Sequence, residues 1–358
     1  MIQRWKLERE LARIKGQFIQ IPWLIYGKIE KSLYDRSKYK KIAIHDGAIQ
    51  LTDRVAVLLI YQPSGVLRST IAQLRYLAAH GFSTLVVSNT PLRDGDLEQM
   101  KEFAFQIMVR PNYGYDFGGY RDGVLHVLNF GAQLKALIVL NDSVWLPVHK
   151  DSDPVAEAMK ETPDLFGITY STHGRTPHRS HIQSYFFRFG EKVLKDPFFE
   201  EYWRNLPVSS NKYTVVRRCE MGLTNAFRSR GYSFGVMQND KKNLSHLLSL
   251  SDDQMRDLLH YLPNVISSYR THFEPVTRLL ESGEDWRAEL SRLINANQTN
   301  LPFLSQHPST MLGCSQSPVL KKYKKEPYKI QREEIRRLNY LKCINPEIAE
   351  EIENWDLA

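Results

Sequence analysis

The sequence has few cysteines, no long apolar run and no low-complexity tract, and each shortage excludes a class of protein. Cys219, Cys314 and Cys343 are far apart and form no CxxC pair, which argues against a disulfide framework and against a zinc site of closely spaced thiolates. No stretch reaches the roughly 20 apolar residues of a membrane-spanning helix, and charges stand where a secretory signal has its apolar core. We therefore expect a cytoplasmic protein with reduced thiols.

The composition is that of an ordinary folded protein with a basic charge balance. The 358 residues are 42% hydrophobic and 25% charged, which suits one large domain with an appendage or two modest domains. The formal net charge of +8 favours an anionic partner: a phosphorylated substrate, an acidic membrane surface or nucleic acid. Nucleic acid is not expected, because the basic residues concentrate at the two ends without a recognisable binding motif or stacking array.

Residues 1–48 are predicted to form a basic helical segment with an apolar insert, Ile19 to Tyr26, that Pro22 interrupts. One interpretation is peripheral binding to an anionic membrane at the inner face of the plasma membrane, with Trp23 and Tyr26 at headgroup depth. The other is a helix that packs against the domain and leaves its basic face in solvent.

Residues 49–238 alternate between apolar runs and helical periodicity, which predicts an α/β fold with a mostly parallel sheet and helices on both faces. The expected strands are 55–61, 83–88, 106–110, 136–140, 164–171, 181–189 and 232–237. The expected helices are 69–80, 94–105, one from the turn at 111–119 to 129, 154–160 and 212–230. Residues 239–358 are predicted to form a largely helical C-terminal region.

Ligands of such sheets bind beyond the carboxyl ends of the strands, so the residues there are expected to share one crevice. They are Tyr61, Gln62, Asn89, Asn112, Gly114, Asp116, Asn141, Asp142 and Ser143. The glycines around Asp116 allow close backbone approach to a ligand, although a tight turn with Asp116 as helix cap predicts the same pattern. The Asp142 carboxylate suits a divalent cation, Mg²⁺ or Mn²⁺, that bridges a diphosphate, and the alternative is an Asx turn.

Two further groups of polar residues are candidates. Glu220 lies at the start of an amphipathic helical stretch, where a carboxylate either interacts with the helix dipole or serves as general base for an acceptor hydroxyl. His181, Gln183 and Tyr185 alternate along a predicted strand and so share one face. That face suits contacts to a sugar or a phosphate, or is simply an exposed face of the sheet.

Taken in order, these motifs resemble those of glycosyltransferases with a GT-A-type fold. In that large inverting family an Asn-x-Gly turn, an Asp-x-Asp-type motif and a Glu-Asp pair before a helix follow one another, and here Asn112, Asn141-Asp142-Ser143 and Glu220 occupy those places. The sequence departs from the pattern twice. The metal motif has one carboxylate instead of two, and Met221 stands where the second acid of the pair would be.

A closer resemblance is to the rhamnan synthesis protein F family of bacterial polysaccharide glycosyltransferases. It rests on four motifs: the NxGxDxG turn from Asn112, the LNDSVWLP segment from Leu140, the HIQSYF segment from His181 and the EMGLT segment from Glu220. The similarity extends to Pro318-Val-Leu-Lys321 and covers roughly residues 53 to 325.

The resemblance implies a hexosyltransferase that moves a sugar, such as rhamnose or another deoxyhexose, from a nucleoside diphosphate donor to a cell-surface polysaccharide or its lipid-linked precursor. It implies inversion with Glu220 as general base, Asp142 with a divalent cation at the diphosphate, and Asp116 and Asn112 at the nucleoside. The alternative is a non-catalytic nucleotide-sugar or glycan-binding module of a polysaccharide assembly complex, because the reduced carboxylate count also suits a degenerate site.

Overall fold

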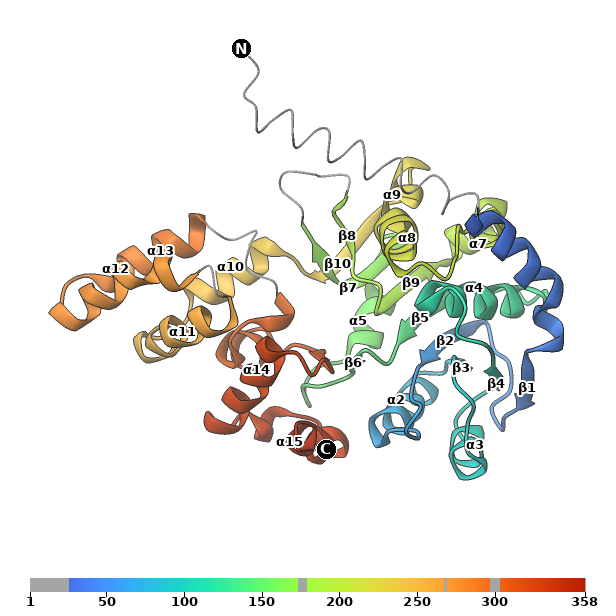
Figure 1. Cartoon of the computed structure of the whole chain (residues 1–358), viewed down its shortest axis with the longest axis horizontal. Coiled ribbons are helices and arrows are strands. Elements are labelled where there is room, and N and C mark those ends of the chain that lie inside the picture. The colour runs from blue at the N-terminus through green and yellow to red at the C-terminus, as the bar shows by residue number, and fades with distance from the viewer. Residues whose placement is uncertain (1–25, 173–178, 267–268, 297–302, 358) are drawn as a thin grey trace, which may run out of the picture.

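The computed structural model describes residues 26–172, 179–266, 269–296 and 303–357, which are arranged around one nine-stranded sheet (Figure 1). The strand order is β1-β4-β3-β2-β5-β9-β7-β10, with β8 paired to β7. These strands are β1 (Ala43–Asp46), β2 (Arg54–Ile60), β3 (Ser83–Ser88), β4 (Gln106–Val109), β5 (Ala136–Asn141), β7 (Leu165–Ser171), β8 (His181–Ile182), β9 (Phe186–Gly190) and β10 (Phe234–Gln238). A separate short pair joins β6 (Val144–Trp145) to β11 (Leu320–Lys321).

The centre of the sheet is parallel. β2 pairs in parallel with both β3 and β5, and β3 pairs in parallel with β4. Nearly every residue of β2, β3 and β5 is buried, as expected for parallel strands that are covered on both faces. The α/β fold with a mostly parallel sheet, predicted from the sequence, is confirmed.

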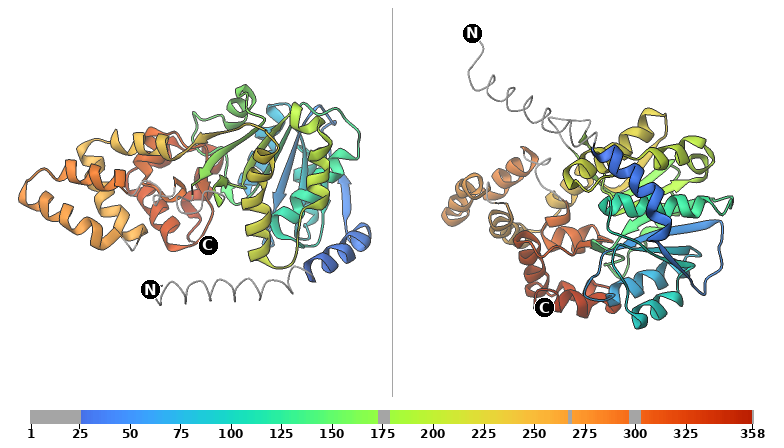
Figure 2. Two further views of the ribbon diagram at one scale, coloured as in Figure 1. Left: turned by 90° about the horizontal axis from the view of Figure 1, so that it is seen from above. Right: turned by 45° about the vertical axis from the view of Figure 1, so that its right-hand side comes forward.

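Helices cover both faces of this sheet (Figure 2). On one face, Leu77 and Met100 of α2 and α3 pack on the strands, and on the other Tyr120 and Trp203 of α4 and α7 do so. The helices up to β10 are α2 (Arg68–Ala79), α3 (Asp94–Lys101), α4 (Tyr115–Leu128), α5 (Pro154–Lys160), α6 (Glu191–Lys195), α7 (Pro197–Asn205), α8 (Lys212–Val215) and α9 (Met221–Ser229).

The helical C-terminal region contains two packing units. Its helices are α10 (Asp240–Leu248), α11 (Asp252–Val265), α12 (Tyr269–Ser282), α13 (Trp286–Ala296), α14 (Glu326–Arg337) and α15 (Pro346–Asn354). α10 to α13 have an apolar cluster of their own, around Leu258 and Leu290, and α12 and α13 project away from the sheet (Figure 1). α14 and α15 instead join the cluster beneath α2 through Ile335 and Ile348. The last part of the chain therefore belongs to the core of the sheet domain.

Two parts of the sheet differ from the prediction. The expected strand 181–189 is two strands, because the chain turns between β8 and β9, and β9 runs antiparallel between β5 and β7. The alternation of His181, Gln183 and Tyr185 along one strand is therefore wrong. In addition, β1 lies inside the segment that was expected to be helical and pairs antiparallel with β4.

The N-terminal helix, residues 26–37, packs on α4. The Tyr34 hydroxyl donates to Asp122 Oδ2 at 2.6 Å, and Lys38 Nζ donates to Asp122 Oδ1 at 2.9 Å. Arg121 donates to both oxygens of Asp35. For these residues the structure has the packed helix of the second interpretation, whereas Pro22 and Trp23 lie outside the described residues. None of the helices in the described ranges is long and apolar enough to span a membrane.

Candidate functional site

The carboxyl ends of β2 and β5 lie side by side and fix the Asp142 carboxylate. Leu59 pairs with Asn141 across these strands, so Asp142 follows beside Ile60 and its side chain reaches Tyr61. Asp142 Oδ2 accepts hydrogen bonds from the backbone N–H of Tyr61 and from Nε2 of Gln62, both at 2.9 Å. Three predicted residues from two strand ends are thereby brought together. The Tyr61 side chain itself is 53% exposed and is available to a ligand.

The glycine-rich turn is shaped by close backbone contacts with the sheet. Gly114 caps α4 with a left-handed φ of 76°, a conformation that favours glycine. A Cβ on Gly119 would lie 2.3 Å from Leu59 Cδ1 of β2, so this first turn of α4 presses directly on the sheet. Beside the turn, Asn89 Nδ2 donates to Asn112 Oδ1 at 3.1 Å. These two predicted residues also meet, and Asn112 is the exposed one.

Asp116 lies in the first turn of α4 and does not cap it. No side-chain capping bond forms at this helix start, and Asn141 Nδ2 donates to Asp116 Oδ2 at 3.3 Å. The residue as a whole is exposed, yet many protein atoms surround its carboxyl group. Desolvation, followed by the charges of Asp142 and Glu220, raises the pKa of Asp116 to about 6.

Glu220 is the last residue of a π-helical turn, η3 (Val216–Glu220), just before α9. Such turns are frequent at functional sites. Ser184 Oγ donates to Glu220 Oε1 at 2.7 Å, and the Tyr120 hydroxyl donates to the carbonyl oxygen of Ser184 at 2.8 Å. The turn between β8 and β9 thus holds one oxygen of Glu220. The charge of Glu220 helps to raise the pKa of Asp116.

Lys321 joins this cluster from the C-terminal region and was not among the predicted site residues. In the β11–β6 pair, Lys321 lies opposite Val144, and its Nζ donates to Ser143 Oγ at 3.0 Å. Burial lowers the pKa of Lys321 against the opposing effect of Glu220, Asp116 and Asp142. The sequence signal was slight: Lys321 ends the Pro318-Val-Leu-Lys321 segment of the family resemblance, but no local pattern connects it to Ser143.

His181, Gln183 and Tyr185, which lie between β7 and β9, make different kinds of contact. Tyr185 is buried, and its hydroxyl donates to Thr169 Oγ1 at 2.5 Å, so only its ring is near the cluster, 5.8 Å from Lys321 Nζ. His181 is buried with Nδ1 2.6 Å from the carbonyl oxygen of Arg179. The backbone N–H of Gln183 donates to the carbonyl oxygen of Thr169, and its side chain is half-buried. These contacts do not assign a ligand role to the three residues.

The donor set fits a protein-held divalent cation poorly. Among the described residues, no group of three or more His, Cys, Asp or Glu side chains could hold a metal ion. Asp142 Oδ2 already has two N–H donors directed at it, whereas Mg²⁺ requires about six oxygen ligands in near-octahedral geometry. The metal role of Asp142 stays a prediction, and any such ion would depend mainly on oxygens from outside the chain.

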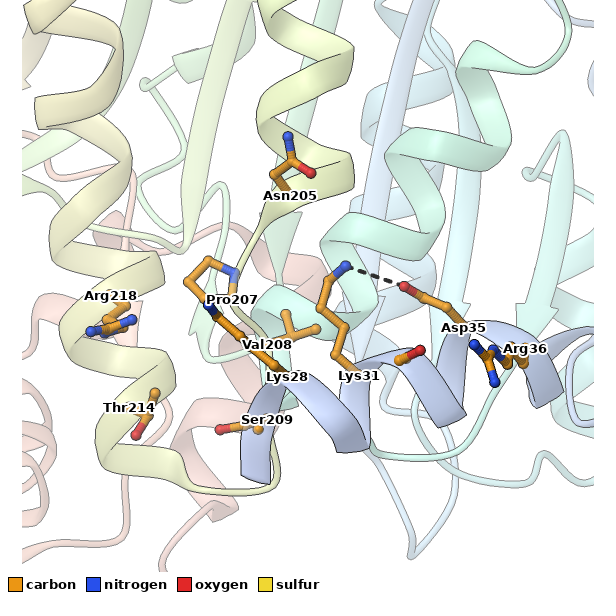
Figure 3. A pocket seen from close by; sticks show the side chains of 12 residues that line it. Lys28, Lys31, Asp35, Arg36, Asn205, Pro207, Val208, Ser209, Thr214 and Arg218 are labelled. Carbon is orange, nitrogen blue, oxygen red and sulfur yellow. Dashed lines mark hydrogen bonds and ion pairs between the residues drawn. The ribbon is translucent and has the colours of Figure 1, made fainter. Parts of the chain in front are cut away.

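A separate cavity of about 490 Å³ lies between the N-terminal helix and the loop before α8 (Figure 3). Its lining includes Lys28, Arg36, Val208 and Arg218, and none of the predicted site residues. Figure 3 shows Arg36 and Arg218 at opposite ends rather than converging on one point. This loop also contacts the glycine-rich turn, because the Tyr113 hydroxyl donates to the Val208 carbonyl oxygen.

The fold and the site together define an α/β protein with three carboxylates and one lysine at the carboxyl edge of a mostly parallel sheet. Residues 84–251 match the family model described as rhamnan synthesis protein F. The chain is also similar to the uncharacterized protein y4gN of Sinorhizobium fredii (strain NBRC 101917 / NGR234), with 33% identity over 357 residues that cover 99% of this chain and 93% of the relative. The chain belongs to the rhamnan synthesis protein F family, which places it in polysaccharide synthesis.

Proposed function

We propose that this protein is a GT-A-like glycosyltransferase that transfers a sugar, such as rhamnose or another deoxyhexose, from a nucleoside diphosphate to a cell-surface polysaccharide or its lipid-linked precursor. The observation that carries the proposal is the meeting of Asp116, Asp142 and Glu220 at one edge of the sheet. Family membership supports it. Each carboxylate comes from a different motif of the sequence, and each is fixed by a hydrogen bond.

The donor is expected to lie along the carboxyl ends of β2 and β5. Tyr61 offers an exposed aromatic ring for the base, because a flat base stacks well on such a ring. Asn112 and Asp116 offer hydrogen-bond acceptors for the ribose from the glycine-rich turn. The diphosphate then extends past the start of α4, where the helix dipole and the free backbone amides favour negative charge, towards Ser143.

Glu220 is proposed to act as the general base of an inverting transfer. Its Oε1 is held by Ser184, which leaves Oε2 to accept the proton of the acceptor hydroxyl. As the oxygen of the acceptor hydroxyl attacks the anomeric carbon, the bond from this carbon to the phosphate oxygen breaks. The electron pair of that bond leaves with the diphosphate. The acceptor proton ends on Glu220, so charge and protons balance.

A non-catalytic nucleotide-sugar or glycan-binding module is the second candidate. It is favoured by Met221 at the place of the second acid of the GT-A pattern and by the poor metal donor set. Such a module would bind the donor without turnover. Transfer to a glycan, or slow hydrolysis of the donor, separates the enzyme from the module.

A thermal-shift screen tests the shared part of both candidates. A nucleoside diphosphate at 100 times its Kd is expected to raise the free energy of unfolding by about 2.7 kcal/mol. The screen should include uridine, guanosine, cytidine and thymidine diphosphates and their sugars, each with Mg²⁺ and with EDTA. A protein that is stabilised by none of them does not bind this class of donor, and the proposed function is then wrong.

A further inference from the structure

Two neighbouring lysines, Lys321 at the end of β11 and Lys322 directly after it, point to opposite sides of the chain. Lys321 Nζ donates to Ser143 Oγ in the candidate site. Lys322 Nζ donates to Ser69 Oγ of α2 at 2.8 Å and lies 4.0 Å from Glu351 Oε1 of α15. Alternate residues of a strand face opposite sides, so the β11–β6 pairing places one lysine in the site and the other in the packing between helices.

The surroundings of Lys321 differ from those of a structural lysine. Glu220, Asp116 and Asp142 are near enough to act on it electrostatically, yet within the described ranges it makes no ion pair at 4.0 Å or less. Its one hydrogen-bond acceptor there is the Ser143 hydroxyl, and its ammonium lies 5.8 Å and 4.9 Å from the ring centroids of Tyr185 and Tyr323. An ammonium has three N–H donors, so donors remain for a ligand.

The position of Lys321 is where an anion is expected if the donor lies along the strand ends. Ser143 directly follows Asp142, on the loop that leads into β6. Three carboxylates alone would repel a diphosphate, and the protein supplies a poor donor set for a metal that could offset this repulsion. A half-buried ammonium interacts with a phosphate more strongly than a fully solvated one, because the local dielectric is lower.

We propose that Lys321 binds the diphosphate of the donor, in the position where a divalent cation would otherwise be needed, and stabilises the charge that develops as the diphosphate leaves. This inference rests on the proposed function and adds to it a residue from the C-terminal region. In the transfer step, Lys321 keeps its proton and donates a hydrogen bond to a non-bridging phosphate oxygen. The electron pair of the breaking bond stays on the departing oxygen, and the acceptor proton goes to Glu220.

The test compares Lys321→Met with the matched control Lys322→Met by calorimetric titration with uridine, guanosine, cytidine and thymidine diphosphates and the corresponding monophosphates. For the diphosphate that the wild type binds, Lys321→Met is expected to weaken affinity at least 10-fold, whereas the monophosphate should lose far less. Lys321→Arg should keep most of the affinity. Lys322→Met should lower the melting temperature and leave the ratio of diphosphate to monophosphate affinity unchanged.

Each outcome decides something. If the wild type binds the diphosphate in EDTA with an affinity within about threefold of that in Mg²⁺, the assignment of Lys321 to the diphosphate is supported. A factor of 3 corresponds to only about 0.7 kcal/mol of binding free energy. Equal diphosphate affinity of Lys321→Met and the wild type overturns the Lys321 assignment and leaves the proposed function standing. A wild type that binds no nucleotide of the panel overturns both. If Lys321→Met does not fold, Lys321→Gln, which keeps a polar side chain, takes its place with the same expected ratio.

Discussion

Two charged clusters lie along helix α4, and they are built in opposite ways. In the cluster at Asp122, the carboxylate is 1% exposed and contacts Arg110, Lys38 and the Tyr34 hydroxyl. In the cluster at Asp116, no cation within the described residues comes within 4.0 Å of the three carboxylates, and the partners are Asn141, the pair Tyr61 and Gln62, and Ser184.

The difference shows how structure and function divide the charged residues of one helix. A buried charge without a counter-charge is costly, so the Asp122 cluster is paired and joins the N-terminal helix to α4. The carboxylates near Asp116 are oriented by neutral donors, and Lys321 acts on them electrostatically without forming an ion pair within 4.0 Å in the described residues. The first cluster thus serves packing, whereas the second leaves carboxylate oxygens available to a ligand, and this contrast can be tested from both sides.

The largest expected effect is on turnover. Glu220→Gln keeps the size and the Ser184 hydrogen bond but cannot accept a proton, so kcat should fall by roughly 10² to 10⁴. Donor affinity and melting temperature should stay near those of the wild type. Transfer to a glycan acceptor is the measurement, with Glu200→Gln, an exposed carboxylate paired to Arg204, as control. Near-wild-type turnover would remove Glu220 from the mechanism.

The next effect is on stability. Asp122→Asn leaves the Arg110 guanidinium, whose side chain is 0% exposed, without its counter-charge, and should lower the free energy of unfolding by about 3 to 5 kcal/mol. Urea denaturation measures this change. Asp253→Asn is the control, since that carboxylate is 90% exposed. A loss below 1 kcal/mol at Asp122 would mean that its pairing does not hold the N-terminal helix.

The smallest expected effect is a gain in the free energy of unfolding, not a loss. The pKa of Asp116 is raised to about 6, so the folded state holds this proton more tightly than the unfolded chain. The contribution of Asp116 to wild-type stability should therefore fall as pH rises from about 4 to 6. Asp116→Asn removes the penalty and should be the more stable protein above pH 7, by about 1 kcal/mol or less because the group is open to solvent. The gain should vanish near pH 4.

Thermal unfolding of both proteins between pH 4 and 8 measures this difference. A variant that is less stable than the wild type at pH 8 would show that Asp116 stabilises the start of α4, as a cap would. In that case the contrast between the two clusters would fail at its central residue.

Local patterns in the sequence predicted the central strands, because β2, β3 and β5 are continuous apolar runs. They did not predict β1, whose residues are mostly exposed, or the two-residue strands β6 and β11. The start of α4 was placed too late, since glycines discourage a helix prediction. Gly119 and Gly123 lie inside the helix because any Cβ would collide with Leu59 and Val57 of the sheet.

The residues of the candidate site also differ in whether the sequence could predict them. Asp116, Asp142 and Glu220 stand in motifs that are contiguous in the sequence, so each could be selected before the structure was known. Lys321 is separated from Ser143 by 178 residues, and only the β11–β6 pairing brings the two together. The hydrogen bonds that orient Glu220 depend on the turn between β8 and β9, which no periodicity in the sequence indicated.

The β11–β6 pairing also bears on when the site becomes complete during synthesis. β6 leaves the ribosome with the first half of the chain, whereas β11 follows nearly at the end, after all the helices from α10 to α13. A nascent or prematurely terminated chain can contain every strand of the nine-stranded sheet and still lack the ammonium beside Ser143. The site is therefore complete only after β11, late in the chain, has been synthesised and has paired with β6.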